Sequence, residues 1–166
     1  MVAITLPDGS KRDYDGSVSG ADVAADIGPG LAKAALAVRV GGVLKDLSTM
    51  IEADNEISII TSKDDEALGI LRHDCAHVMA EAVKELYPET QVTIGPNIEN
   101  GFYYDFARET PFISKDLEKI EKHMHEIVKR DEKITRELWD RAKAIKFFEG
   151  QGEHYKAEII EGIPDG

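Results

Sequence analysis

Short stretches of alternating apolar and polar residues dominate the first sixty residues, and a period of two is typical of β-strands. The stretch "AITLPDGSKRDYD" predicts two strands joined by a turn at residues 7–9, where proline fixes φ and glycine accepts a positive φ. The stretch "AVRVGGVLKDL" predicts a second hairpin that turns at residues 41–42, and "NEISIIT" predicts a last strand. The first part of the chain is therefore expected to form a small sheet.

One helical segment interrupts these strands. Ser19 is the expected N-cap of a helix that runs to about Ile27, breaks at residues 28–30 and resumes through residues 31–36. The resulting order β-β-α-β-β-β suits a sheet wrapped on one helix, as in the ubiquitin-like β-grasp arrangement.

The hydrophobic period becomes helical from residue 64 onward, which predicts a domain boundary near residues 61–63. One domain is then expected over residues 1–62 and a second over residues 63–166.

The second domain is predicted to be α+β. Ser62 should cap a helix that runs to about Tyr87, and Ser114 should cap a second long helix that ends near Arg130. Between them, "QVTIGPNIENGFYYDF" predicts an antiparallel strand pair that turns at Asn100-Gly101. Shorter elements are expected in "TRELWDRAKAIKFFEG", as a helix, and in "EHYKAEIIEGIPDG".

Each long helix is predicted to have one apolar stripe that faces the core. The stripe of the first helix contains Cys75, the only cysteine of the chain. We therefore interpret Cys75 as a small hydrophobe packed in the core rather than as a reactive thiol. The first stripe consists of Ala67, Leu68, Leu71, Cys75, Val78, Met79, Ala82 and Leu86, and the second of Leu117, Ile120, Met124, Ile127 and Val128.

The stretch "HDCAH" places His73 and His77 four residues apart, so their rings should project from one patch on the side opposite the stripe. Their neighbours there include Ala76 and Ala80, small residues that would leave room for a ligand or a closely packed element. A solvated surface pair explains the pattern equally well. Two histidines could also ligate a zinc ion, but a zinc site needs a third protein ligand. The sequence has no suitable downstream cluster of cysteine and histidine.

Composition narrows the possible functions. The chain has 166 residues, 42% of them hydrophobic and 31% charged, and its net charge of -12 argues against nonspecific phosphate binding. The most basic stretch, Arg141, Lys143 and Lys146, is interpreted as a solvated helix face. A single cysteine cannot form an internal disulfide, and no apolar run reaches about 20 residues. Together with the absence of a secretory signal, this predicts a cytoplasmic protein without a membrane partner.

The order of these segments resembles the N-terminal region of bacterial threonyl-tRNA synthetases. The stretches "ITLPDGS", "DIGPGLAKAALA" and "ISIIT" are similar to the TGS domain of that family, a β-grasp module. The stretches "RHDCAHVMAEAVKELYP", "IGPNIENGFYYDF" and "GEHYKAEII" are similar to its editing domain. The resemblance covers nearly the whole chain and implies a part of a threonine-tRNA ligase that hydrolyses threonine tRNA mischarged with serine.

The same resemblance nominates four site residues and a role for each. His73 would position or activate the hydrolytic water, and His77 would shape the pocket. Lys156 would hold the water or stabilise charge on the ester, and Tyr104 would orient the substrate or the terminal adenosine. Without the resemblance, Tyr104 would be interpreted as a half-buried strand residue and Lys156 as a solvated one.

The chain also departs from the family pattern, in which a cysteine and a histidine four residues later complete the editing site. No such pair occurs here, which predicts a truncated editing domain with weak activity or none. The ATP, magnesium and zinc of the family are implied for a catalytic domain that these residues do not include. That domain would also form the homodimer, so the fragment itself is expected to be a monomer without a cofactor or metal.

Two alternatives are a zinc-dependent trans-editing hydrolase of the alanyl-tRNA type and a non-enzymatic TGS-type module that binds RNA or a regulatory partner. Zinc bound to the purified protein would favour the first. Binding by residues 1–62 alone would favour the second.

Overall fold

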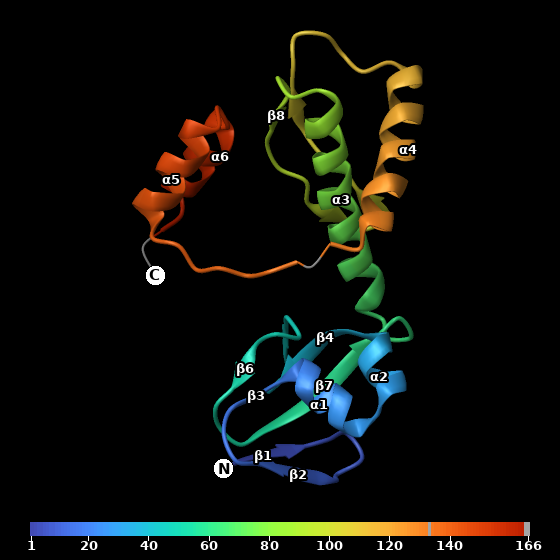
Figure 1. The fold of residues 1–166 in the computed structure, drawn as a ribbon, viewed down its shortest axis with the longest axis vertical. Helices are drawn as coiled ribbons and strands as arrows, with labels where there is room; N and C mark the ends of the chain where they lie inside the picture. The colour runs from blue at the N-terminus through green and yellow to red at the C-terminus, as the bar shows by residue number, and fades with distance from the viewer. Residues whose placement is uncertain (133, 165–166) are drawn as a thin grey trace. The chain divides into compact units, whose positions relative to one another are not determined.

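The structure is a computed structural model that describes residues 1–132 and 134–164. It divides into two compact units between Leu71 and Arg72, inside the helix α3 (Ala67–Leu86; Figure 1). This division lies later in the chain than the predicted boundary near residues 61–63. The domains 1–62 and 63–166 stay a prediction.

A five-stranded sheet in the order β2-β1-β7-β4-β5 forms the first unit. β1 and β7 run parallel, and the other neighbours in the sheet are antiparallel. The strands are β1 (Val2–Thr5), β2 (Lys11–Tyr14), β4 (Ala35–Val40), β5 (Val43–Lys45) and β7 (Asn55–Thr61). Both predicted hairpins are confirmed, and φ is +54° at Gly41 and +83° at Gly42, as a tight turn of this length requires. A short pair, β3 (Val18–Ser19) with β6 (Met50–Ile51), was not predicted.

The predicted helix is confirmed in this unit, and its break is limited to Gly28 rather than residues 28–30. α1 (Gly20–Ile27) is followed by α2 (Pro29–Ala34), which ends two residues earlier than predicted because β4 begins at Ala35. Ser19 caps α1: its hydroxyl accepts from the backbone N–H of Asp22, and the Asp22 carboxylate accepts from the backbone N–H of Ser19.

Apolar side chains of α1 and the sheet form the core of the first unit. A Cβ atom on Gly20 would lie 2.7 Å from two carbons of Val38, so α1 packs directly on β4. This is the β-grasp arrangement expected from the sequence. The buried cluster consists of Val2, Ile4, Val18, Val23, Val38, Val40, Ile51 and Ile57.

Among its described residues, the second unit has four helices and two short strand pairs, which confirms the α+β class. The predicted strand pair is present as four short strands, in which β9 and β10 form the hairpin and β8 pairs with β11. The strands are β8 (Gln91–Val92), β9 (Asn97–Ile98), β10 (Gly101–Phe102) and β11 (Phe106–Ala107). The helices after α3 are α4 (Ser114–Arg130), α5 (Arg141–Gly150) and α6 (His154–Glu161).

Two predicted helix starts are wrong. Ser62 does not cap α3, because the Asp64 carboxylate accepts from the backbone N–H (2.6 Å) and the hydroxyl (2.9 Å) of Thr61 and closes a turn there. In α4 the cap position is Ile113, one residue before Ser114. The segment predicted as a helix over residues 135–150 is helical only from Arg141 onward, where it forms α5.

The predicted stripe of α3 is only partly correct. Cys75 is exposed, as are Leu68 (55%) and Leu71 (49%), whereas Ala76 and Ala80 are buried at 1% and 7% exposure. A single stripe assumes one packing partner. The C-terminal half of α3 instead has several, since it packs against α4 and also contacts the start of α6. Of the α4 stripe, Leu117 and Val128 are exposed. The buried cluster between α3 and α4 consists of Ala82, Val83, Ile120 and Ile127.

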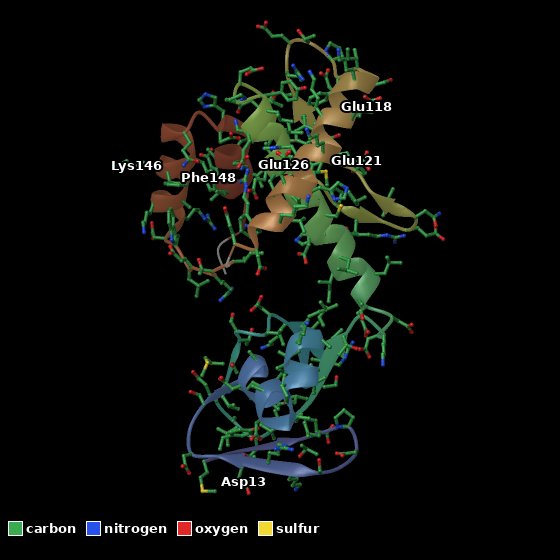
Figure 2. The ribbon with its side chains drawn as sticks, turned by 45° about the vertical axis from the view of Figure 1, so that its right-hand side comes forward. Asp13, Glu118, Glu121, Glu126, Lys146 and Phe148 are labelled. Atoms are coloured by element: carbon green, nitrogen blue, oxygen red, sulfur yellow. The ribbon has the colours of Figure 1, made fainter. Side chains whose placement is uncertain are left out.

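The exposed faces of α4 and α5 carry charged side chains. Glu118 and Glu121 on α4 and Lys146 on α5 are exposed, as Figure 2 shows. Lys143 is exposed too and lies over the Trp139 ring at 4.1 Å, which agrees with the interpretation of this basic stretch as a solvated face. Among the described helices, none has the length and apolar character needed to span a bilayer.

Candidate functional site

His73 and His77 lie one turn apart on α3 and contact each other directly. Their Nε2 atoms are 3.1 Å apart, and the rings meet edge to face with centroids 4.6 Å apart. The predicted common patch is confirmed, and both histidines are exposed, although the neighbouring Ala76 and Ala80 are buried. At this distance one ring nitrogen donates a proton and the other accepts it. At least one of the two imidazoles is therefore neutral.

The electrostatic surroundings favour a neutral His77. Burial lowers the pKa of His77, and the charges of His73 and Lys156 lower it further, while the nearby Asp74 opposes them. A neutral imidazole offers a lone pair that can accept a proton from water.

Lys156, the third predicted residue, lies in the first turn of α6. Its charge is one of the causes that lower the pKa of His77. Its ammonium lies over the ring of Phe148 on α5, 5.3 Å from the centroid (Phe148 is labelled in Figure 2). Lys156 is half-buried rather than fully solvated. A histidine pair beside an ammonium group is suited to binding and polarising an ester.

Tyr104 occupies the loop between β10 and β11, and its ring is fixed on two sides. It stacks on Phe106 with centroids 5.0 Å apart, and it lies against Gly95, where a Cβ atom would come within 2.2 Å of the ring. Burial, followed by the charge of Glu153, raises the pKa of the Tyr104 phenol and keeps it protonated as a donor. The hairpin before Tyr104 is tied to α3, because Arg72 donates to the carbonyl of Glu99 (3.0 Å).

Two features of this region were not predicted from the sequence. The first is Gly95, whose missing side chain makes room for Tyr104. The second is Glu153, the residue before α6, which is 3% exposed and pairs with Lys84 on α3 at 2.5 Å. A glutamate directly before a helix is a common sequence feature, and nothing in its spacing indicates burial.

The donor set does not fit a zinc ion. Two imidazole nitrogens 3.1 Å apart could ligate one ion, but catalytic zinc has three protein ligands. No group of three or more His, Cys, Asp or Glu side chains in the described part of the chain is arranged to hold a metal. The ammonium of Lys156 beside His77 would also repel a cation.

A separate charged cluster links α3 to α4. Glu85 accepts from both terminal nitrogens of Arg130 at 2.6 Å, and His123 lies 2.6 Å from the same carboxylate. These hydrogen bonds, from Arg130 first, lower the pKa of Glu85 to about 2. The contacts with Glu126 and Glu85 raise the pKa of His123.

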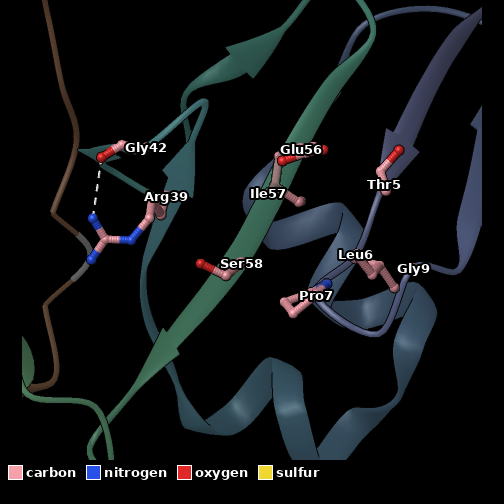
Figure 3. Close-up of a pocket in the computed structure, with 9 residues that line it drawn as sticks. All are labelled: Thr5, Leu6, Pro7, Gly9, Arg39, Gly42, Glu56, Ile57 and Ser58. Atoms are coloured by element: carbon pink, nitrogen blue, oxygen red, sulfur yellow. Dashed lines mark hydrogen bonds between the residues drawn. The ribbon is translucent and has the colours of Figure 1, made fainter.

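The first unit has a hollow of ≈ 460 Å³ beside strand β7 (Figure 3). The guanidinium of Arg39, which lines this hollow, donates to the carbonyl of Gly42 (3.1 Å) and pairs with Glu66. Glu56 and Ser58 line the same hollow. Because the arginine is already paired and a carboxylate lies nearby, the hollow is not suited to binding an anion.

Comparison with known proteins matches residues 2–61 to the TGS domain family. Those residues are a TGS domain. The chain is 70% identical over 165 residues to the threonine–tRNA ligase of Paramagnetospirillum magneticum, and 63% identical to those of Rhodospirillum rubrum and Thiobacillus denitrificans. Each match covers at least 99% of this chain and 26% of the relative, so the chain spans about a quarter of the length of these ligases. The resemblance seen in the sequence is confirmed, whereas the roles of the four site residues stay predictions.

Proposed function

We propose that this chain is part of a threonine–tRNA ligase and that its second unit removes serine wrongly esterified to threonine tRNA. The observation that carries the proposal is the contact of His73 with His77 beside the charge of Lys156. The relatives named threonine–tRNA ligase support the tRNA substrate.

The need for such a reaction follows from the substrates. Threonine and serine differ by one methyl group, and a pocket discriminates one methylene by only about 1–3 kcal/mol. A ligase that must be more accurate requires a second site that hydrolyses the wrong ester.

The reaction would be an ester hydrolysis carried out by side chains. The histidine pair accepts a proton from water as the water oxygen attacks the ester carbonyl. Lys156 stabilises the negative charge that develops on that carbonyl oxygen. The bond to the ribose oxygen then breaks, and the ribose oxygen takes the proton back. Tyr104 donates a hydrogen bond that orients the ester or the terminal adenosine.

The ligation step belongs to other parts of the ligase in this proposal. We place its ATP, magnesium and zinc outside these residues and expect the dimer to form there, so the chain alone is a monomer. The net charge of -12 supports a tRNA-binding surface that lies largely in other parts of the ligase. Translation places the protein in the cytoplasm, and an unpaired cysteine fits a reducing compartment.

The test uses this chain alone and a chimera in which it replaces the matching quarter of the P. magneticum ligase. Deacylation of seryl-tRNA is measured for both proteins, with and without His73→Ala. We expect weak activity or none from the chain alone, because the cysteine and the histidine four residues later that complete the site in the family do not occur in it. We expect full activity of the chimera. His73→Ala should slow the chimera by about 10²–10⁴-fold, the usual contribution of a general base.

His125→Ala is the matched control, because His125 is exposed on α4. A chimera that edits normally with alanine at position 73 would contradict the role of His73. A chimera that ligates threonine but never edits would contradict the proposed function and leave the TGS-type binding module as the better alternative.

A further inference from the structure

One ion pair, in which the carboxylate is buried, joins three segments next to the candidate site. The ammonium of Lys84 donates to the carbonyls of Pro88 (2.7 Å) and Thr90 (3.0 Å) and pairs with Glu153 at 2.5 Å. An ammonium group has three protons, so these three acceptors satisfy it completely. The pair thus connects α3, the turn that follows α3, and the start of α6.

Glu153 is the more buried partner of this pair and therefore depends on it more strongly. Its side chain is 5% exposed, whereas that of Lys84 is 29% exposed. A buried carboxylate is unfavourable unless it is paired, so the position of Glu153 is set by the position of Lys84.

Lys156 depends on Glu153 through the backbone of α6. Glu153 occupies the position before the helix, and Lys156 lies three residues later in the first turn. The backbone N–H of Glu153 donates to the carbonyl of Phe148 (2.9 Å), and Lys156 lies over the ring of the same Phe148. The backbone N–H of His154 donates to the side-chain oxygen of Gln91 on β8 (3.2 Å). The start of α6 is therefore held from both α3 and the β8–β11 pair.

Glu153 also acts on Tyr104. One carboxylate oxygen pairs with Lys84, while the other, Oε2, is buried without a hydrogen-bond partner among the described residues. The charge of this carboxylate reaches Tyr104. Because Oε2 is inaccessible, Glu153 does not touch a substrate.

We propose that the Lys84–Glu153 pair is the positioning element of the editing site, which holds the start of α6, and with it Lys156, in place relative to His73 and His77. The inference rests on the proposed function. It assigns roles to two residues that lie outside the four predicted from the sequence.

The first experiment measures hydrolysis by the chimera with Glu153→Gln. A displacement of about 1 Å in an active site lowers the rate by about 100-fold. We expect such a loss in kcat for seryl-tRNA deacylation with little change in KM, and no change in threonine ligation. The matched control is Glu158→Gln, an exposed glutamate on the same helix, which should leave both rates unchanged.

The second experiment measures the pKa of His77 by NMR in this chain and does not depend on activity. Since the charge of Lys156 lowers the pKa of His77, release of Lys156 by Glu153→Gln should raise that pKa. Lys156→Met should raise it as well, and Glu153→Gln should add nothing to Lys156→Met. A purely structural role of Glu153 far from the site would leave the pKa of His77 unchanged.

A third variant covers the case in which Glu153→Gln fails to fold. Replacement of both partners, Lys84→Met with Glu153→Met, removes the buried charges together, and such replacements often preserve stability. We expect this double variant to fold and to hydrolyse seryl-tRNA about 100-fold more slowly. A folded double variant at the parental rate would overturn the inference.

These outcomes separate the two proposals. If His73→Ala slows editing and the Glu153 variants do not, the positioning role is wrong and the proposed function stands. If His73→Ala has no effect, the proposed function itself is wrong.

Discussion

Replacement of Gly95 by alanine tests whether the position of the Tyr104 ring matters for hydrolysis. A Cβ atom on Gly95 would lie 2.2 Å from Cδ2, 2.6 Å from Cε2 and 2.8 Å from Cγ of that ring. Carbon atoms in contact are about 3.5–4.0 Å apart, so the ring must move by more than about 1 Å. Because Cγ is one of the clashing atoms, rotation of the ring about its own axis does not relieve the clash.

The expected loss in rate is large compared with the loss in stability. A shift of about 1 Å lowers an enzymatic rate by about 100-fold, which corresponds to about 2.7 kcal/mol in the barrier. Overpacking in a core usually destabilises a protein by about 1–3 kcal/mol, and the lower end applies here because Tyr104 is only half-buried.

Single-turnover deacylation of seryl-tRNA by the chimera measures the effect of Gly95→Ala. Gly150→Ala is the matched control, because a Cβ atom there meets nothing within 4 Å. Tyr104→Leu and its combination with Gly95→Ala complete a double-mutant cycle. If Gly95 acts only through the ring, adding Gly95→Ala to Tyr104→Leu should cause no further loss. A Gly95→Ala enzyme at the parental rate, beside a slow Tyr104→Leu enzyme, would refute the reasoning.

Three further predictions concern stability and reactivity. Gly20→Ala should destabilise the TGS domain by about 1–3 kcal/mol through its clash with β4, whereas Gly30→Ala, which meets open space, should stabilise it by about 0.4–1 kcal/mol. Urea unfolding followed by NMR signals of residues 2–61 measures both, and equal stabilities would contradict the close packing of α1. Cys75 is exposed and should react with a thiol reagent in the native chain, so protection until unfolding would contradict the observed surface. The lowered pKa of Glu85 adds stability that is present above pH 4.5 and lost as the pH falls toward about 2. Comparison with Glu85→Gln by acid unfolding should show an advantage that fades over that range, and an advantage independent of pH would disprove the linkage.

Local sequence signals predicted most of the β-grasp fold. The turns at residues 7–9 and 41–42 and the cap at Ser19 depend on neighbouring residues, and all three are present in the structure. The β3–β6 pair was missed because its two-residue strands are too short to show a period.

The burial of α3 could not be predicted from its period, because several elements pack against it. The pattern placed Cys75 inside and Ala80 outside, and the structure has the reverse. An alanine fits both a crowded interface and an open face, so its position in the pattern carries little information. The pairing of His73 with His77 was predictable, since four residues make one helical turn. The contact between Lys84 and Glu153 was not predictable, since it joins residues far apart in the sequence.

The parallel pairing of β1 with β7 affects how the TGS domain folds while it is being synthesised. Ile4 lies opposite Asn55, so the first strand of the domain completes its hydrogen bonds only after the last strand has been made. At about 5–20 residues per second, the ribosome adds the intervening segment in roughly 3–10 s. During that time the β1–β2 hairpin has a free inner edge, and the buried Ile4 has no completed core to enter. Long-range closure of this kind favours slow folding.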